Sequence, residues 1–402
     1  MKAILFNIPS VGHVNPTLPI IRQLQNSQIE VVYANAHESR AKVEATGVRF
    51  VAYPDDSRIH GLDNRVDITD FAHNAMLLVE ITQELLPFCQ RLIETEKPDF
   101  IIHDSLAAWA RPVADMYSLP RLGLSSVFLL HPSMMRMIPF AHTRKMLFGI
   151  LSRFPRYIPI GWDMWRSTGV RPVDMNEVLS SLGDETIVFT GRNFQPAGDK
   201  YDDRFHFVGS TISENRDMGD FPVDALRDDV PLVYISLGTI AHNNSFLQTC
   251  FTAFADFPAQ FILSAGKQTD LTSLQAPANF IVRNFVPQLA ILDRVSAFVT
   301  HGGMNSVHES LNAGVPMILV PQQIEQLMVT KRVIEIGAGV GTQMTPPLGT
   351  PSIAQLQSSL QAVLKNQQMP LQAKQVGNSL RSAGGVDEAV RVIKTFAQKH
   401  VR

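Results

Sequence analysis

At 402 residues the chain exceeds the roughly 250 to 300 residues at which a single hydrophobic core stops growing, so two domains are expected. Hydrophobic residues make up 45% and charged residues 18%, which excludes disorder over the whole length. The formal net charge of -2 lacks the basic surplus typical of nucleic-acid binding, so no nucleic-acid partner is expected.

Cys89 and Cys250 are the only cysteines, and they fall in different predicted domains. This excludes a disulfide framework and a thiolate metal site, and it favours a reducing cytoplasm. The apolar run at the N-terminus is too short for a secretory signal, and no stretch approaches the roughly 20 apolar residues that span a bilayer. We therefore expect a cytoplasmic protein without stable membrane insertion.

Apolar runs alternate with helical periodicity through the first half of the chain. Residues 3–8 predict a strand that ends in a loop around Gly12, and a helix is expected after Pro16. Further strands are expected at 29–33, 48–51, 100–102 and 121–124, with a long helix over 71–93. This alternation is typical of a parallel sheet covered by helices on both faces.

The same rhythm restarts after a polar, acidic stretch at 213–230, which is typical of an interdomain linker. Strands are expected at 232–236, 261–264, 280–282, 297–300 and 317–320, and a helix over 386–396. The predicted organisation is an N-terminal domain at 1–212, the linker, and a C-terminal domain at 231–385. The last residues, 386–402, are expected to pack back on the first domain.

Ligands of open parallel sheets bind where the carboxyl ends of the strands meet. The residues that follow a predicted strand there are His13, Asp104, Gly238 with Thr239, His301, and the segment 322–326. In the first domain, His13 is a suitable general base near neutral pH, and Asp104 would orient it. A purely local role, with His13 bracing its loop and Asp104 capping a helix, is the alternative.

In the second domain, the run 300–306 places Gly302 and Gly303 before a helix. The glycines let a ligand approach the backbone, and the free N–H groups of a helix N-terminus suit a diphosphate. Asn305 and Ser306 are expected to cap that helix, and Glu309 on the same face would accept ribose hydroxyls. A glycine-rich turn with a locally satisfied His301 is the alternative.

The segment from His131 to Trp165 is rich in methionine and aromatic residues and predicts an adaptable apolar wall for an acceptor. Core packing is the alternative for most of these residues. The same segment carries five basic residues without an acid between them, which predicts attraction to an anionic membrane or an acidic acceptor unless those charges are simply solvated.

Three segments resemble the UDP-glycosyltransferase family, in its bacterial macrolide glycosyltransferase branch: Gly12-His13-Val14-Asn15-Pro16, the turn at 236–239, and the stretch 285–326. The resemblance implies a GT-B fold of two facing Rossmann-like α/β domains. It also implies inverting transfer of a hexose, glucose by preference, from a UDP-sugar to a hydroxyl of a small hydrophobic acceptor such as a macrolide or flavonoid.

The resemblance assigns roles to individual positions. His13 matches the catalytic base and Asp104 its partner, while Phe285, where many relatives carry tryptophan, would stack on uracil. The other residues implied in donor binding are Gly238, Thr239, Val286, Gln288, His301, Gly303, Asn305, Ser306, Glu309, Glu325 and Gln326.

No metal and no cofactor are expected, because the chain lacks an Asp-x-Asp triplet and the UDP-sugar is itself a substrate. A UDP-sugar epimerase or hydrolase, or a non-catalytic sugar-nucleotide-binding partner, stays open as an alternative. A dinucleotide-dependent dehydrogenase is disfavoured, because no Gly-x-Gly-x-x-Gly turn follows the first strand.

Overall fold

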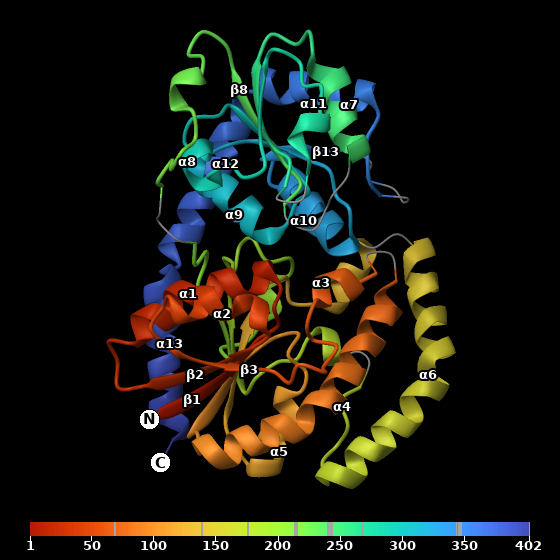
Figure 1. Ribbon diagram of the computed structural model, residues 1–402, viewed down its shortest axis with the longest axis vertical. Helices are drawn as coiled ribbons and strands as arrows, with labels where there is room; N and C mark the ends of the chain where they lie inside the picture. The colour runs from red at the N-terminus through yellow and green to blue at the C-terminus, as the bar shows by residue number, and fades with distance from the viewer. Residues whose placement is uncertain are drawn as a thin grey trace. The chain divides into compact units, whose positions relative to one another are not determined.

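A computed structural model of the chain describes residues 1–67, 70–137, 140–174, 177–212, 216–238, 244–266, 269–342, 344 and 348–401. The chain divides into two compact units. Unit 1 comprises Met1–Ile212 and Ser382–Arg402, and unit 2 comprises Ser213–Arg381. Each unit is built on one parallel sheet, and Figure 1 labels the helices and some of the strands.

The sheet of unit 1 has seven strands in the order β3-β2-β1-β4-β5-β6-β7. Every pairing is parallel, so all the carboxyl ends lie at one edge. The strands are β1 (Lys2–Phe6), β2 (Glu30–Asn35), β3 (Arg49–Ala52), β4 (Phe100–Asp104), β5 (Arg121–Ser125), β6 (Glu185–Val188) and β7 (Phe205–Phe207).

Alternate residues of β1 pack into two separate apolar cores, one on each face of the sheet. Ile4 and Phe6 join the core beneath α4 and α5, whereas Ala3 and Leu5 join the core beneath α1 and α13. The helices of unit 1 are α1 (Val11–Leu24), α2 (Arg40–Glu44), α3 (Leu62–Arg65), α4 (Phe71–Glu96), α5 (Ala110–Tyr117), α6 (Phe140–Thr168) and α13 (Gly385–His400).

The last helix, α13, belongs to unit 1 although it follows unit 2 in the chain. Its Phe396 ring lies 5.9 Å from the ring of Phe100, centroid to centroid. At its first turn, Asp387 accepts a 2.7 Å hydrogen bond from Gln23 of α1. Both contacts fasten the end of the chain to the first sheet.

The sheet of unit 2 has six parallel strands in the order β10-β9-β8-β11-β12-β13. They are β8 (Leu232–Ser236), β9 (Gln260–Ser264), β10 (Phe280–Arg283), β11 (Ala297–Thr300), β12 (Met317–Leu319) and β13 (Gly339–Gly341). The helices are α7 (Asn244–Phe254), α8 (Gln288–Leu292), α9 (Met304–Ala313), α10 (Ile324–Glu335), α11 (Ile353–Lys365) and α12 (Gln368–Ser382). Two Rossmann-like α/β domains are thus confirmed.

One predicted boundary is wrong in a way that matters for the site. The helix expected after Pro16 begins at Val11, so His13 lies in the first turn of α1 and not in a loop. Pro16 and Pro19 lie inside this helix, beyond the first four N–H groups that lack a helical partner, so the proline at 16 does not mark the helix start. The sequence prediction also missed β6, β7 and β13, which are short and lie toward the sheet edges.

Candidate active site

Both sheets place polar residues at a point where the strand order reverses. In unit 1 the chain runs from β1 outward to β2 and β3 and then returns to β4 beside β1. In unit 2, β9 and β10 lie on one side of β8 and β11 on the other. Such switch points leave a crevice at the carboxyl edge, which is where open α/β sheets bind ligands.

The switch point of unit 1 brings His13 and Asp104 together. Nδ1 of His13 lies 2.8 Å from Oδ2 of Asp104 and 2.9 Å from Oγ of Ser126. Asp104 ends β4 and Ser126 directly follows β5, so two neighbouring strands supply the two partners. His13 keeps 9% of its residue surface exposed, and Asp104 is almost completely buried.

These contacts determine which nitrogen of His13 carries the proton. A buried carboxylate accepts hydrogen bonds, so its neighbour Nδ1 must be the donor. The other oxygen of Asp104, Oδ1, accepts from the backbone N–H of Leu106 at 2.8 Å. Nε2 of His13 then holds the lone pair, which is the state that a general base requires.

Beneath His13, a directed chain of hydrogen bonds holds the first turn of α1. Nδ2 of Asn7 donates to the hydroxyl of Tyr33 (2.7 Å), which contacts Oγ1 of Thr17 (2.9 Å), and Thr17 donates to the carbonyl of Val14 (2.8 Å). Asn7 also reaches the carbonyl of His13 at 3.3 Å. Burial raises the pKa of Tyr33, so its hydroxyl stays protonated and can donate to Thr17.

Ser126, Asn7 and Tyr33 were not predicted from the sequence. No motif marks them, because each acts through a neighbour in the sheet and not through its own position in a pattern. The strand order β2-β1-β4-β5 brings Ser126 to the ring of His13 and Tyr33 to Asn7 and Thr17.

In unit 2, the ring of His301 stands between two glycine backbones. A Cβ atom on Gly238 would lie 2.8 Å from Cε1 of His301, and one on Gly303 would clash with Nε2. Gly238 and Gly302 also have φ values of +76° and +82°, where side chains are strained. Glycine is therefore needed on both sides of the ring.

Burial lowers the pKa of His301 to about 4, so the ring is neutral at pH 7. Within the described residues, its Nδ1 is buried and has no hydrogen-bond partner. A buried N–H group without a partner is rarer in folded proteins than a buried acceptor without one, so Nδ1 is assigned as the unprotonated nitrogen. The proton of the neutral ring then lies on Nε2. Nε2–H is thus the donor that this ring can offer to an anion.

Helix α9 starts at Met304 with Gly303 as its N-cap residue. The expectation that Asn305 and Ser306 cap this helix is therefore wrong, since both lie inside its first turn. There they accompany the unpaired backbone N–H groups and the partial positive charge of the helix start. That arrangement suits an anionic group such as a diphosphate.

Glu309, one turn further along α9, contacts Gln288 at the start of α8. Nε2 of Gln288 donates to Oε2 of Glu309 and lies 3.3 Å from Oγ of Ser306. Burial raises the pKa of Glu309 to about 7, with Gln288 and the charge of Arg216 acting in the opposite direction. The carboxyl group is therefore poised between its two protonation states near neutral pH.

The remaining predicted donor residues differ in their surroundings. Phe285 exposes 68% of its surface, an unusual amount for an aromatic residue, whereas Val286 beside it is buried. Oε1 of Gln326 accepts from the backbone N–H of Gln322 at 2.8 Å, so that oxygen already has a partner, and Glu325 is exposed. Thr239 lies outside the described residues.

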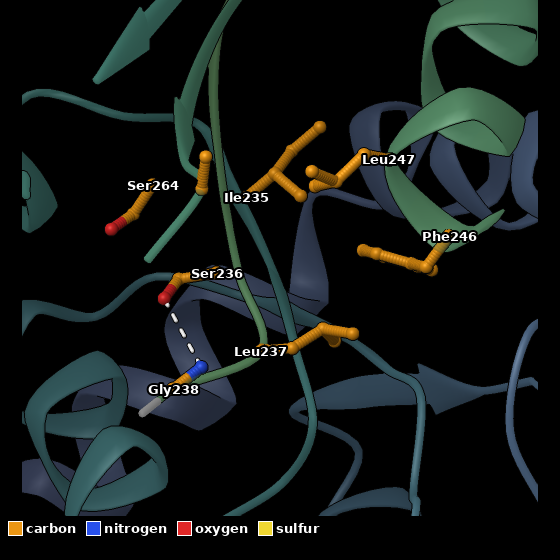
Figure 2. A pocket seen from close by; sticks show the side chains of 8 residues that line it. Ile235, Ser236, Leu237, Gly238, Phe246, Leu247 and Ser264 are labelled. Atoms are coloured by element: carbon orange, nitrogen blue, oxygen red, sulfur yellow. Dashed lines mark hydrogen bonds between the residues drawn. The ribbon is translucent and has the colours of Figure 1, made fainter. Parts of the chain in front are cut away.

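A depression at the carboxyl ends of β8 and β9 lies beside Gly238. Figure 2 shows Ser236 and Ser264 on one side of it and the apolar side chains of Phe246 and Leu247 on α7 on the other. The hydroxyl of Ser236 accepts a 3.3 Å hydrogen bond from the backbone N–H of Gly238, which helps to fix the glycine turn next to His301.

The segment predicted as an acceptor wall divides into buried and exposed residues. Met134 and Met164 are buried, whereas Phe148, Phe154 and the two tryptophans of α6 are exposed. The side chains of residues 135–142 lie outside the described part, so Met135, Met137 and Phe140 are not placed.

One cluster among the described residues could hold a metal ion. It consists of His37, Asp55 and His60, each of which contributes one possible ligand atom, and these three atoms lie within 4.8 Å of one another. His37 and Asp55 are exposed, and Nε2 of His37 lies 2.6 Å from Oδ1 of Asp55. A hydrogen bond between these exposed side chains accounts for their contact without a metal.

The family of UDP-glucoronosyl and UDP-glucosyl transferases matches residues 224–373. The chain is 32% identical over 398 residues to the NDP-glycosyltransferase YjiC of Bacillus subtilis (strain 168), covering 98% of this chain and 97% of that protein. It is 27% identical to the oleandomycin glycosyltransferase of Streptomyces antibioticus, over 97% and 89% of the two chains.

Among solved structures, the glycotransferase of kitacinnamycin matches with a TM-score of 0.81 and 26% identity, over 98% of both chains. Together with the two parallel sheets, this confirms the GT-B fold. None of the helices within the described ranges combines the length and the hydropathy needed to cross a membrane.

Proposed function

The chain belongs to the UDP-glycosyltransferase family, and we propose that it transfers glucose from UDP-glucose to a hydroxyl of a small apolar acceptor, with inversion at the anomeric carbon. The observation that carries this proposal is the buried pair of His13 and Asp104, with 2.8 Å between Nδ1 and Oδ2. The pair provides a base and no protein nucleophile, which suits direct attack by the acceptor oxygen.

In the proposed reaction, Nε2 of His13 takes the proton from the acceptor hydroxyl. The acceptor oxygen forms a bond to the anomeric carbon as the bond from that carbon to the diphosphate oxygen breaks, and UDP leaves. Asp104 stabilises the imidazolium that results, and Ser126 holds the ring in place. General-base catalysis of this kind contributes typically 10²- to 10⁴-fold, and positioning of the two reactants supplies much of the rest.

Donor binding is proposed to use unit 2. The exposed face of Phe285 would stack on uracil, with Gln288 and the backbone of Val286 at its polar edge. Glu309 would accept the ribose hydroxyls in place of its present bond from Gln288. Glu325 and the free end of the Gln326 amide would meet the hydroxyls of the sugar.

The diphosphate is proposed to lie at the start of α9 without a metal ion. Nε2–H of His301 and the first N–H groups of α9 can stabilise the negative charge that develops on the leaving UDP. Gly238 and Gly303 permit the approach, because neither carries a side chain that would displace the ring of His301. Asn305 and Ser306 would add side-chain donors, as would Thr239. No cofactor enters this reaction.

The acceptor class is inferred from relatives. One relative along nearly the whole chain is named an oleandomycin glycosyltransferase, which supports a macrolide or another apolar scaffold with a free hydroxyl. Phenolic compounds such as flavonoids are also apolar scaffolds with a free hydroxyl and are included in the test.

Mass spectrometry of a reaction with UDP-glucose and a panel of macrolide and phenolic acceptors tests the proposal. The expected result is a product heavier by one hexose, formed by the wild-type chain and lost in His13→Ala, with UDP-glucose binding retained in that variant. Release of UDP without a glycoside product would support a hydrolase instead, and full transfer by His13→Ala would refute the assigned base.

A further inference from the structure

Helix α6 exposes a continuous row of large apolar side chains. From Leu147 onward they follow one another at intervals of three or four residues, and each keeps between 48% and 73% of its surface exposed. The row consists of Leu147, Leu151, Phe154, Ile158, Trp162 and Trp165, with Phe148 beside it. Intervals of three and four residues place side chains on one face of a helix, so the row is a single stripe.

The opposite face of α6 is firmly seated on unit 1. Ile150, Tyr157 and Ile160 pack against the core beneath α4, and Met164 is part of it. Figure 1 shows α6 running along the outer side of α4. Two ion pairs fasten the helices further: Arg153 with Asp70 at 2.7 Å, and Arg156 with Glu80 at 2.5 Å. The apolar stripe is therefore the side that unit 1 leaves uncovered.

Contiguous apolar surface of this kind marks an interaction site in most folded proteins. Scattered exposed apolar residues are ordinary, but seven on one helix face are not. The 29-residue helix is also too rich in polar residues to be a membrane span, in keeping with the absence of such spans among the described helices. A helix of this composition suits a surface that it lies on and does not cross.

Charge on α6 selects the partner. Between Phe140 and Trp165 the helix has four arginine or lysine residues and one acid, Asp163. Arg153 and Arg156 are already paired with Asp70 and Glu80. Arg144, three residues before Leu147, and Arg166, four residues after Trp162, are exposed on the side of the stripe, one at each end. Both can extend toward negative charge while their stems lie along the apolar row.

A second copy of this chain is a poor fit for this stripe. A symmetric dimer would bring the same patch against itself, and with it the same cations. A lipid surface with anionic headgroups offers hydrocarbon to the apolar row and negative charge to Arg144 and Arg166. Tryptophan, as at positions 162 and 165, is the residue that favours the boundary between the two.

We propose that α6 is a membrane-docking helix, which lies in the plane of an anionic lipid surface with its exposed stripe in the headgroup region. The stripe spans 19 residues from Leu147 to Trp165, and the 18 steps of 1.5 Å between these two residues give a length of about 27 Å. The site is separate from the catalytic residues and does not depend on the identity of the acceptor.

The three tryptophans of the chain provide a direct probe. Trp109 is fully buried in unit 1, whereas Trp162 and Trp165 lie in the stripe. With vesicles of phosphatidylglycerol, we expect the full-length protein to co-sediment and its tryptophan emission to shift to shorter wavelength. With phosphatidylcholine vesicles, the lipid concentration needed for half-maximal sedimentation and for half of the emission shift should be at least tenfold higher. The reason is that a net-neutral surface offers no anionic partner to the arginines.

The double variant Leu151→Glu/Ile158→Glu should reduce partition onto phosphatidylglycerol vesicles by at least tenfold. Its matched control is Ile353→Glu/Leu371→Glu, which adds the same charge at two exposed apolar positions of unit 2 and should bind as the wild type does. Trp162→Phe/Trp165→Phe should still sediment but lose most of the emission shift. Because the two Trp→Phe changes keep the stripe apolar, this variant still tests whether the stripe contacts lipid if the glutamate variant does not fold.

Three results would overturn the proposal. The first is no sedimentation of the wild type with phosphatidylglycerol vesicles. The second is equal sedimentation of the stripe variant and its unit 2 control. The third is a dimer, seen by light scattering, that the stripe variant abolishes while vesicle binding is absent, since the stripe would then cover a second copy.

Discussion

His13 and Asp104 are 91 residues apart in the chain, yet Nδ1 of one lies 2.8 Å from Oδ2 of the other. The distance is short because β1 and β4 are neighbours in the sheet although β2 and β3 come between them in the sequence. His13 follows β1 and Asp104 ends β4, so the reversal of strand order itself makes the contact.

Replacing Asp104 by Asn should lower kcat by about 100-fold to 10,000-fold. The amide of asparagine can donate to Nδ1, which would place the proton of His13 on Nε2 and remove the lone pair that accepts from the substrate. Steady-state kinetics with UDP-glucose and an acceptor that the wild type glycosylates measure the effect. Calorimetry should find the affinity for UDP-glucose unchanged, and a kcat within threefold of the wild type would contradict the assigned role.

Ser126→Ala should lower kcat by about fivefold, which corresponds to the loss of one hydrogen bond of about 1 kcal/mol. Ser125→Ala is the matched control, since the hydroxyl of Ser125 contacts the carbonyl of Val127 and not the ring of His13. The comparison uses kcat at saturating donor. If both variants lose activity equally, the effect lies in the loop after β5 and not in the orientation of His13.

The sequence was sufficient to predict most of the sheets and both polar edges. Strands such as Leu232–Ser236 and Ala297–Thr300 are continuous apolar runs, and the structure has them with the predicted bounds. The sequence Gly339-Val340-Gly341 has a single apolar side chain, so β13 carries no such signal. Edge strands bury less surface, and their sequences are correspondingly less apolar.

The residues around His13 were harder to predict, because their roles depend on strand order. The predicted loop at His13 is the first turn of a helix, since two prolines inside α1 obscured its start. Ser126 is one of many serines, and its contact with His13 follows only once β5 is known to lie beside β4. The polar edge and the family resemblance led to His13 and Asp104 as the proposed base and its carboxylate, but not to the residues that hold them in place.

Gly238→Ala should weaken UDP-glucose binding by at least tenfold. Its Cβ would approach Cε1 of His301 within 2.8 Å, so the ring must move away from the start of α9. Gly47→Ala is the control: Gly47 has a similar φ of +86° but nothing within 4 Å of its Cβ, so it shares the backbone strain and not the clash. Calorimetric titration with UDP-glucose compares the two, and equal losses would mean that a general loss of fold stability, and not the clash with His301, is responsible.

Glu309 should make donor binding depend on pH. Because burial raises its pKa to about 7, the carboxyl is largely protonated at pH 6 and largely ionised at pH 8. Only the ionised form accepts from both ribose hydroxyls with both oxygens, so the affinity for UDP-glucose should rise by about tenfold across this range, as expected for hydrogen bonds to a charged group.

The sign of this dependence distinguishes Glu309 from its neighbours. His301, with a pKa of about 4, stays neutral from pH 6 to pH 8 and contributes no change. Calorimetry should therefore find a rising affinity in the wild type and a flat, weaker affinity in Glu309→Gln, whose side chain does not titrate. UDP-glucose is the ligand of choice because the terminal phosphate of free UDP would itself titrate near pH 6. An unchanged slope in Glu309→Gln would place the titrating group elsewhere and remove Glu309 from the ribose.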